Sequence, residues 1–411
     1  MKLDWPKTKL KKHTVKIGSG ITPKGGEAVY KSSGIPLIRS QNVLVNRLDL
    51  SDVAYIEESQ HKKMSGSKVY SGDVLLNITG ASIGRSCVVP KEIGEANVNQ
   101  HVCIIRLKET LDARLLSTYL NSWFGQKQIW SFQSGGSREG INFQQIGSFD
   151  IPLPPLPEQK AIADILSTWD EAIEKTEKLI KEKEKRFKQM SKWFLFGHKR
   201  VSLKCSGLKK GAFFSFSKDW ELLKIGKVAK EVSVRNNNSN AIVLSCSKYD
   251  GLVNSLDYFG KKVFSDDTSN YKVVKKWQFA YPSNHVEEGS IGLLEHCDEG
   301  IVSPIYVVFE TNQEQVYPPF LYKLLKTEIF RHIFQVSTSS SVDRRGSLRW
   351  NEFSTIKIPV PSIEEQKQIA ETLNSAQDEI NLLKKLSEKY KQQKQGLMQK
   401  LLTGEWRVRN V

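Results

Sequence analysis

The sequence lacks the features typical of secreted proteins, of membrane proteins and of proteins stabilised by a structural metal site. Its five cysteines are scattered, odd in number and never arranged as Cys-x-x-Cys, which argues against a disulfide framework or a zinc knuckle. No run approaches the roughly 18 apolar residues of a membrane span, and Met1–Lys7 contains no apolar signal core. These absences favour a reducing compartment and predict a cytoplasmic protein.

Motifs of catalysis are missing as well. The chain contains no Asn-Pro-Pro-Tyr or Asp-Pro-Pro-Tyr methyltransferase tetrapeptide. It has no phosphate-binding P-loop, because the glycine-rich stretch Gly80–Arg85 has the wrong length and no lysine. No acid–base or nucleophile arrangement has a recognisable spacing. We therefore predict a chain that is not an enzyme by itself, with no catalytic residues, no metal and no cofactor of its own.

What the chain does contain is an internal duplication. The stretch Ile151–Leu166 returns as Ile358–Leu373 at an offset of 207 positions without a gap. Between 151–201 and 358–408 the two copies share 16 identical residues. Unrelated segments would match at roughly one position in twenty, so the chain consists of two copies of a domain-plus-helix unit.

Length and charge limit the partners. A chain of 411 residues is long for one core and favours two globular domains with connectors. The composition is that of a globular protein, with 39% hydrophobic and 26% charged residues. The net charge of +16 makes duplex DNA a plausible partner, although a merely basic protein would look the same.

Each copy of the repeat begins with prolines and continues as a long heptad pattern. Prolines suit the start of a helix, and the apolar positions then alternate at spacings of four and three residues, as in a coiled coil. Each helix would span about 39 residues, roughly 58 Å. Lys183, Ser387 and Lys394 weaken either stripe alone, so we expect the two helices to pack together. The predicted coiled-coil seam comprises Ile162, Leu166, Trp169, Ile173, Ile180, Ile369, Leu373, Ile380, Leu383 and Leu397.

Short β-branched runs bounded by turn residues precede each helix. The expected strands are 36–39, 53–56, 73–79 and 101–107 in the first copy and 241–246, 278–281, 290–294 and 305–309 in the second. One helix follows in each copy, from Asp112 to about Phe124 and from Pro318 to about Phe330. The predicted fold is mixed α/β (α+β), with two globular domains separated by two long helices that pack as an antiparallel coiled coil, in an internal pseudo-two-fold duplication.

This organisation resembles the specificity subunit of a type I restriction-modification system. The segments Gly72–Arg85 and Val98–Val102 and the two Pro-x-Pro-x-x-Glu-Gln helix starts carry the resemblance, which covers essentially the whole chain. The second domain departs from it by lacking a clear Gly-Asp-Val-Leu-Leu run. The expected segments are a first target recognition domain (1–155), a first conserved helix (156–200), a second target recognition domain (201–360) and a second conserved helix with the C-terminal tail (361–411).

The resemblance implies a division of labour. Each globular domain is expected to read one half of a bipartite site in double-stranded DNA. The helices are expected to act as a spacer and to dock two modification (methyltransferase) subunits, which would bind S-adenosylmethionine. Restriction (motor-nuclease) subunits would use ATP. Neither cofactor is expected on this chain.

Candidate DNA-contacting side chains lie on polar loops, because bases are read by hydrogen-bonding groups and phosphates by cations. Arg138 and Arg345 occupy equivalent loop positions, where phosphate contact and a packing role are equally plausible. The predicted DNA-binding residues are Ser19, Thr22, Lys24, Arg39, Gln41, Asn42, Arg85, Gln100, His101, Arg138, Lys248, Asn284, His285, Arg344 and Arg345.

Two alternatives stay open. The chain could be a non-catalytic DNA-binding scaffold or decoy relative without sequence preference. A DNA-cleaving enzyme rests only on charge and on the Glu-Gln-Lys triplets at 158–160 and 365–367. Those carboxylates lie in the first helical turn, where they complement the helix dipole, and a structural role is the better interpretation.

Overall fold

A computed structural model describes residues 5–23, 25–26, 30–133, 140–199, 207–237, 241–339 and 347–408. The chain divides into two compact units. The first unit comprises 1–179 and 383–411, and the second comprises 180–382. Each unit therefore contains one globular part and half of each long helix. None of the helices in the described ranges is long and apolar enough to span a membrane.

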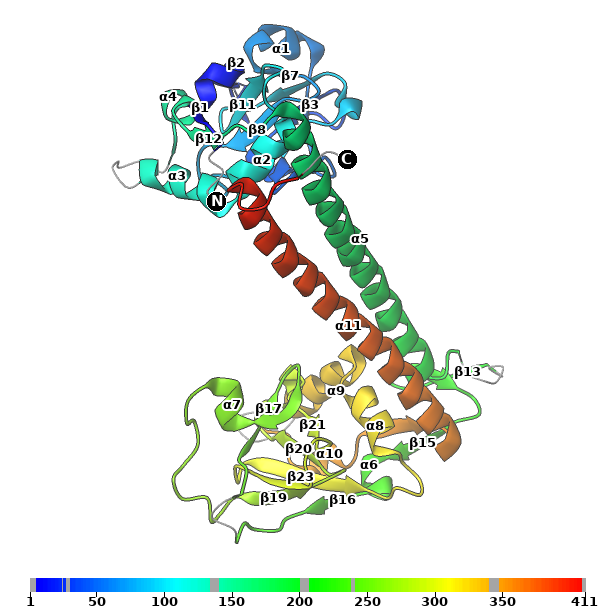
Figure 1. The fold of residues 1–411 in the computed structure, drawn as a ribbon. Helices are drawn as coiled ribbons and strands as arrows, with labels where there is room; N and C mark the ends of the chain where they lie inside the picture. The colour runs from blue at the N-terminus through cyan, green and yellow to red at the C-terminus, as the bar shows by residue number, and fades with distance from the viewer. Residues whose placement is uncertain are drawn as a thin grey trace. The chain divides into compact units, whose positions relative to one another are not determined.

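The first globular part contains short strands and helices (Figure 1). Its strands are β1 (Lys7–Lys9), β2 (Thr14–Ser19), β3 (Ile35–Ile38), β4 (Val43–Leu44), β5 (Arg47–Leu48), β6 (Ala54–Ile56), β7 (Lys68–Val69), β8 (Val74–Asn77), β9 (Ser86–Val88), β10 (Ala96–Val98), β11 (Val102–Leu107) and β12 (Asp150–Pro152). Its helices are α1 (Glu58–Lys63), α2 (Ala113–Asn121), α3 (Trp123–Gln133) and α4 (Phe143–Gly147), with 3-10 turns η1 (Leu10–His13), η3 (Ser40–Asn42), η4 (Ser65–Ser67) and η5 (Lys91–Ile93).

Eight strands of the first part form two four-stranded sheets, while β1 pairs with β12 and β4 with β5. One has the order β6-β3-β10-β7 and the other β2-β11-β8-β9. Helix α2 packs on β8 and β9, so the apolar side chains of the second sheet are buried under it. Leu76, Leu116 and Leu120 belong to this core, and each is almost fully buried.

The second globular part repeats one of these two sheets. Its strands are β13 (Leu208–Lys210), β14 (Ser215–Ser217), β15 (Glu221–Lys224), β16 (Ala229–Val232), β17 (Leu244–Ser247), β18 (Gly251–Asn254), β19 (Lys272–Lys275), β20 (Phe279–Pro282), β21 (Gly292–Leu293), β22 (Glu299–Val302), β23 (Tyr306–Thr311) and β24 (Lys357–Val360). Its helices are α6 (Ile225–Val228), α7 (Ser255–Phe259), α8 (Pro318–Leu325), α9 (Glu328–Ser339) and α10 (Trp350–Phe353), with the 3-10 turn η6 (Val286–Glu288). The sheet β16-β23-β20-β21 matches β2-β11-β8-β9 strand for strand.

Each predicted single helix before the proline stretch is in fact two helices. In the first part Ser122 ends α2 with an extended ψ of 165°. Its hydroxyl donates to Tyr119 O at 2.6 Å and accepts the N–H of Gly125 at 3.4 Å. Thr327 does the same between α8 and α9, with Leu324 O at 2.8 Å. One hydroxyl thus closes the first helix and caps the second.

The two long helices agree closely with the prediction. Helix α5 spans Leu156–Leu195 and α11 spans Ile363–Leu402, each of 40 residues. In each unit the first half of one helix packs against the second half of the other, so the helices run antiparallel. In the first unit Ile162 and Leu166 share a core with Leu401, and in the second Ile369 and Leu373 are packed by Phe187.

The residues of the predicted seam lie on the buried side of each helix. Trp169, Ile173, Ile180, Leu383 and Leu397 are half-buried, and the other five members are fully buried. Two seam lysines are neutralised by acidic partners in their own unit. Lys394 pairs with Asp170 in the first unit, and Lys183 lies 2.6 Å from Glu379 in the second. Polar seam positions of this kind favour one register at a cost in stability.

Candidate nucleic-acid interface

Four loops meet at one end of the first globular part. The backbone N–H of Gly20 donates to Asn99 O at 3.1 Å, and the N–H of Asn99 donates to Ile38 O at 3.0 Å. Thr79 and His101 are joined through Oγ1 and Nδ1 at 2.6 Å. We call this end the first loop face and define it as 19–22, 39–41, 79–85 and 99–101. It brings together most of the candidate DNA-contacting residues of the first domain.

The glycine-rich turn after β8 is fixed by a buried asparagine. Asn77 is fully buried, and its Nδ2 donates to Ser40 O at 2.8 Å and to Ser82 Oγ at 3.1 Å. Gly84 has a φ of +87°, and a Cβ there would lie 2.6 Å from Oε1 of Gln126. Glycine is therefore favoured at this position both by conformation and by space. The turn holds Arg85, which is exposed, at the edge of the loop face.

The predicted residues of the first domain differ in their exposure. Arg85, Gln41 and Gln100 are exposed, although Gln41 also donates to Asp52 Oδ2 at 3.0 Å. The half-buried residues are Ser19, Thr22, Arg39 and His101. Lys24 and Arg138 lie outside the described residues. The exposed members are open to solvent on the loop face.

Asn42 serves the loop and does not face solvent. It is 2% exposed, and its Nδ2 donates to Asp49 O at 2.9 Å and Asp52 O at 3.0 Å. Its Oδ1 accepts the N–H of Arg39 at 2.9 Å. Because these bonds use the polar side-chain atoms inside the domain, the prediction that Asn42 contacts DNA does not fit its position.

Strand pairing identifies equivalent residues in the second domain. Val74 of β8 pairs with Ile105 and Val88, and Phe279 of β20 has the corresponding partners in β23 and β21. Counting back from these residues, Trp277–Gln278 is the equivalent of Gly72–Asp73. Trp277 even has a φ of +68° where Gly72 has +83°. The second domain therefore contains the element whose sequence signature it lacks.

The polar pair beneath this element differs between the domains. In the first, Asp73 accepts two hydrogen bonds of 2.8 Å from Arg106, which raise the pKa of that guanidinium. In the second, Gln278 Nε2 donates to Glu310 Oε2 at 2.8 Å. Asp73 and Gln278 also accept one backbone N–H each, three residues upstream, at 2.8 Å. The turn is thus stabilised by an ion pair in the first domain and by an amide–carboxylate hydrogen bond in the second.

The second loop face is built around a lysine that the sequence did not single out. Lys326 Nζ donates to Lys248 O at 2.6 Å and to Gly289 O at 2.9 Å, and burial lowers its pKa. It therefore joins the β17–β18 turn to the turn that contains Asn284 and His285. We define the second loop face as 245–250, 283–289 and 303–305. Arg344 and Arg345 lie outside the described residues.

The three predicted residues on the second loop face have different surroundings. Lys248 is exposed. His285 is exposed and its Nδ1 lies 3.5 Å from Glu288. Asn284 is half-buried, and its Oδ1 has no hydrogen-bond partner among the described residues. This oxygen is itself buried, so Asn284 does not offer it to a partner in this conformation.

The Glu-Gln pair at each long-helix start is structural. Gln159 is 1% exposed; its Nε2 donates to Pro154 O at 2.9 Å and Thr110 O at 3.2 Å, and its Oε1 accepts the N–H of Asp112 at 2.8 Å. Gln159 therefore links the start of α5 to Asp112, the N-cap residue of α2. Glu158 is bound through both oxygens by Arg407, each at 2.7 Å.

The second helix start repeats the same bonds. Gln366 is fully buried; its Nε2 donates to Pro361 O at 3.0 Å and Gln315 O at 2.8 Å, and its Oε1 accepts the N–H of Tyr317 at 2.8 Å. Tyr317 stands at the N-cap position of α8 as Asp112 does for α2, although only the Asp112 side chain accepts hydrogen bonds from its helix. Glu365 accepts a hydrogen bond from Trp220 Nε1 at 3.2 Å. Side chains engaged in this way are poorly placed to bind a metal ion or activate water.

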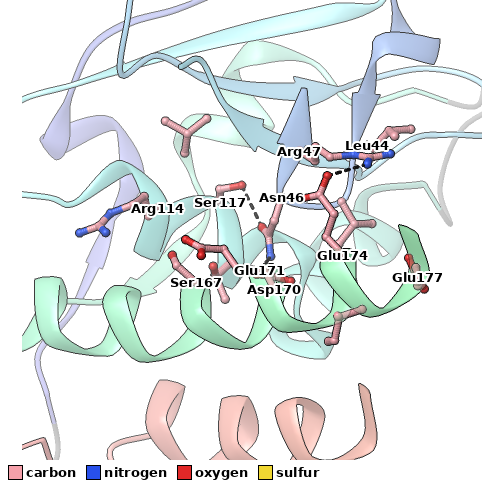
Figure 2. Close-up of a pocket in the computed structure, with 14 residues that line it drawn as sticks. Leu44, Asn46, Arg47, Arg114, Ser117, Ser167, Asp170, Glu171, Glu174 and Glu177 are labelled. Atoms are coloured by element: carbon pink, nitrogen blue, oxygen red, sulfur yellow. Dashed lines mark hydrogen bonds and ion pairs between the residues drawn. The ribbon is translucent and has the colours of Figure 1, made fainter. Parts of the chain in front are cut away.

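A cleft of about 450 Å³ lies in the first unit between the β4–β5 hairpin and α5 (Figure 2). The carboxylates of Glu174 and Asp170, which line this cleft, are both engaged by neighbouring side chains. Glu174 binds Arg47 at 3.0 Å, and Asp170 accepts from Asn46 Nδ2 at 3.2 Å as well as binding Lys394. Asn46 also accepts from Ser117 Oγ at 3.2 Å. The hairpin, which has no counterpart among the described strands of the second unit, thus anchors the globular part to its helix.

These features define a class of protein. The chain has two units that share one four-stranded sheet. Each has a polar loop face, and each is linked to a long helix by an equivalent set of glutamine hydrogen bonds. This is the construction of a duplicated recognition protein with its functional groups on loops.

The comparisons identify the family. The profile of the type I restriction modification DNA specificity domain matches residues 8–184 and again 217–392. The chain belongs to this family and carries two copies of the domain. It is a specificity subunit, the component that recognises a DNA sequence, and its two repeated domains fit a site in two halves.

Relatives are similar over different shares of the chain. The proposed MjaX type I restriction enzyme specificity subunit of Methanocaldococcus jannaschii is 24% identical over 99% of this chain and 94% of its own. The MjaVIII type I restriction enzyme specificity subunit of the same organism is 30% identical over 64% of this chain and 63% of its own.

Solved structures share the fold. The crystal structure of a type I restriction-modification S subunit from M. genitalium matches with a TM-score of 0.58 at 16% identity, over 97% of this chain and 96% of that one. The HsdS subunit from Thermoanaerobacter tengcongensis matches with a TM-score of 0.51 at 16% identity, over 98% of both chains. At this identity the likeness concerns the fold.

Proposed function

We propose that the first loop face reads one half of a bipartite DNA site, that the second reads the other half, and that α5 and α11 act as spacer and docking surface. The observation that carries this proposal is the duplication itself, in which each loop face precedes one glutamine-fastened long helix. Exposed cations on the faces, such as Arg85 and Lys248, suit phosphate or guanine contacts.

The partners proposed for the complex are two modification subunits and the restriction subunits. S-adenosylmethionine and ATP are proposed to bind those subunits and not this chain. The motifs that bind such cofactors are absent from the sequence, and the carboxylates at both helix starts are engaged in structural bonds. On this proposal the chain contributes selection of the site and leaves chemistry to its partners.

Reconstitution tests the proposal. The isolated chain should transfer no methyl groups, whereas the chain mixed with its modification subunits should support methylation of DNA that carries both half-sites. Methyl transfer by the isolated chain would overturn the proposal.

A competition experiment addresses the scaffold alternative. Labelled cognate DNA is challenged with unrelated DNA at moderate salt, where electrostatic binding is weakened. We expect cognate DNA to be retained. Equal competition by both DNAs would favour a scaffold without sequence preference.

A further inference from the structure

The second loop face contains a two-stranded ribbon that the first lacks in the described part of the chain. Among the described strands, β17 and β18 pair only with each other, from Leu244↔Asn254 to Ser247↔Gly251. The parallel pairings Asn97↔Leu37 and Val243↔Ile301 place Leu244 at the position of Ile38, where β3 ends. The ribbon therefore continues three residues beyond the equivalent strand of the first unit.

The tip of the ribbon is held rigidly. Ser247 Oγ accepts the N–H groups of Tyr249 and Asp250, both at 3.2 Å. Lys326 fixes the carbonyl of Lys248, and the N–H of Cys246 donates to the Tyr306 hydroxyl at 3.1 Å. A tip ordered in advance loses little entropy when it binds a partner.

The tip presents an aromatic ring that its own unit leaves largely uncovered. Tyr249 is 79% exposed, the highest value among the exposed large hydrophobic side chains of the described residues. Lys248 Nζ lies 5.7 Å from the ring centre. The neighbouring Tyr258 differs, because its hydroxyl is bonded to Ser247 Oγ at 3.1 Å and supports the turn from within.

We propose that the β17–β18 ribbon enters the major groove of the second half-site, with Tyr249 against a base edge and Lys248 on the adjacent phosphate. This inference rests on the proposed function and adds a specificity-determining residue to it. The major groove, about 12 Å wide, accepts a two-stranded ribbon. The tyrosine ring can pack on a thymine methyl group, and its hydroxyl can exchange hydrogen bonds with a base edge.

The test uses the chain in complex with its modification subunits, after both half-sites have been mapped. Tyr249→Ala and Tyr249→Phe are compared with the control Tyr258→Phe. The thermal midpoint and the methylation activity of this control show what the loss of a hydrogen bond within the turn does by itself. Methylation is measured on DNA with each position of either half-site substituted, and with uracil in place of thymine to remove the methyl group.

We expect Tyr249→Ala to lower methylation of the cognate site roughly tenfold and to relax discrimination at one position of the second half-site. Discrimination in the first half-site should not change in either Tyr249 variant. Tyr258→Phe removes a hydrogen bond within the turn, so it should lower the thermal midpoint without relaxing discrimination at that position. An unaltered preference at every second-half position, or a uniform loss on all sequences, would overturn the inference. If the Tyr249 variants contradict the inference but the complex still discriminates in the first half-site, the proposed function stands. If the complex with the unsubstituted chain discriminates at neither half-site, the proposed function fails.

Discussion

At the scale of single residues, buried glutamines hold each globular part to its helix. Gln159 and Gln366 each make three hydrogen bonds within their own unit. Gln159→Ala should destabilise the first unit by about 2–3 kcal/mol, because a backbone N–H and two carbonyls lose their partner. Chemical denaturation measures the change. The control is Lys160→Ala at the exposed neighbouring position, and equal effects of both variants would contradict the fastening role.

The pair beneath the glycine turn makes a second residue-scale prediction. Asp73 is 2% exposed and binds Arg106 through both oxygens. Asp73→Asn should cost about 2 kcal/mol of unfolding free energy, since the half-buried Arg106 guanidinium loses its counter-charge. The exposed pair Lys9–Asp150 is the control, and Lys9→Ala should cost less than about 1 kcal/mol. Urea unfolding that ranks the two variants equally would count against the assignment.

At this scale the sequence was least informative. Arg39, Gln41 and Asn42 lie close together in the sequence and are all polar, yet Asn42 is buried and Gln41 is exposed. Only the three-dimensional path of the loop separates them. Trp277 likewise hides its equivalence to Gly72, because an aromatic residue at positive φ is not expected from sequence. Lys24, Arg138, Arg344 and Arg345 stay predictions.

At the scale of elements, the heptad periodicity of the sequence predicted the two long helices well, because their apolar positions are set by helix packing. Both long helices start within one or two residues of the prediction, since prolines and a heptad stripe mark their course. The short helices were predicted as single elements because one hydroxyl, Ser122 or Thr327, ends and restarts the helix within an apolar pattern. The hairpin β4–β5 has only two residues per strand, too few for a pattern.

The seam supplies the element-scale prediction. Lys394 is 9% exposed and pairs with Asp170. Asp170→Ala should destabilise the first unit by about 3 kcal/mol, because a buried cation loses its partner. The double variant Asp170→Leu with Lys394→Met should restore most of that loss, since an apolar pair avoids the desolvation cost. Denaturation of the single and double variants measures both, and a double variant no more stable than Asp170→Ala would contradict this account of the seam.

At the scale of the whole molecule, the duplication turns two readers into one recognition protein. Linking two weak contacts raises selectivity only when the linker suits the separation of the sites. One heptad added after Leu179 and one after Leu382, the points where the units divide, lengthen each helix by about 10 Å. The preferred spacer should change while the half-site bases stay the same. Altered bases with an unchanged spacer, read by methylation of a spacer library, would contradict the spacer role.

The measurement that tests the central claim most directly is genome-wide mapping of methylated adenine by long-read sequencing. Cells that express this chain with its modification subunits are compared with cells that lack the chain. We predict one asymmetric motif of two half-sites with a fixed spacer, which disappears without the chain. The account would be contradicted if methylation persisted without the chain, or if the methylated motif were one continuous sequence without a spacer.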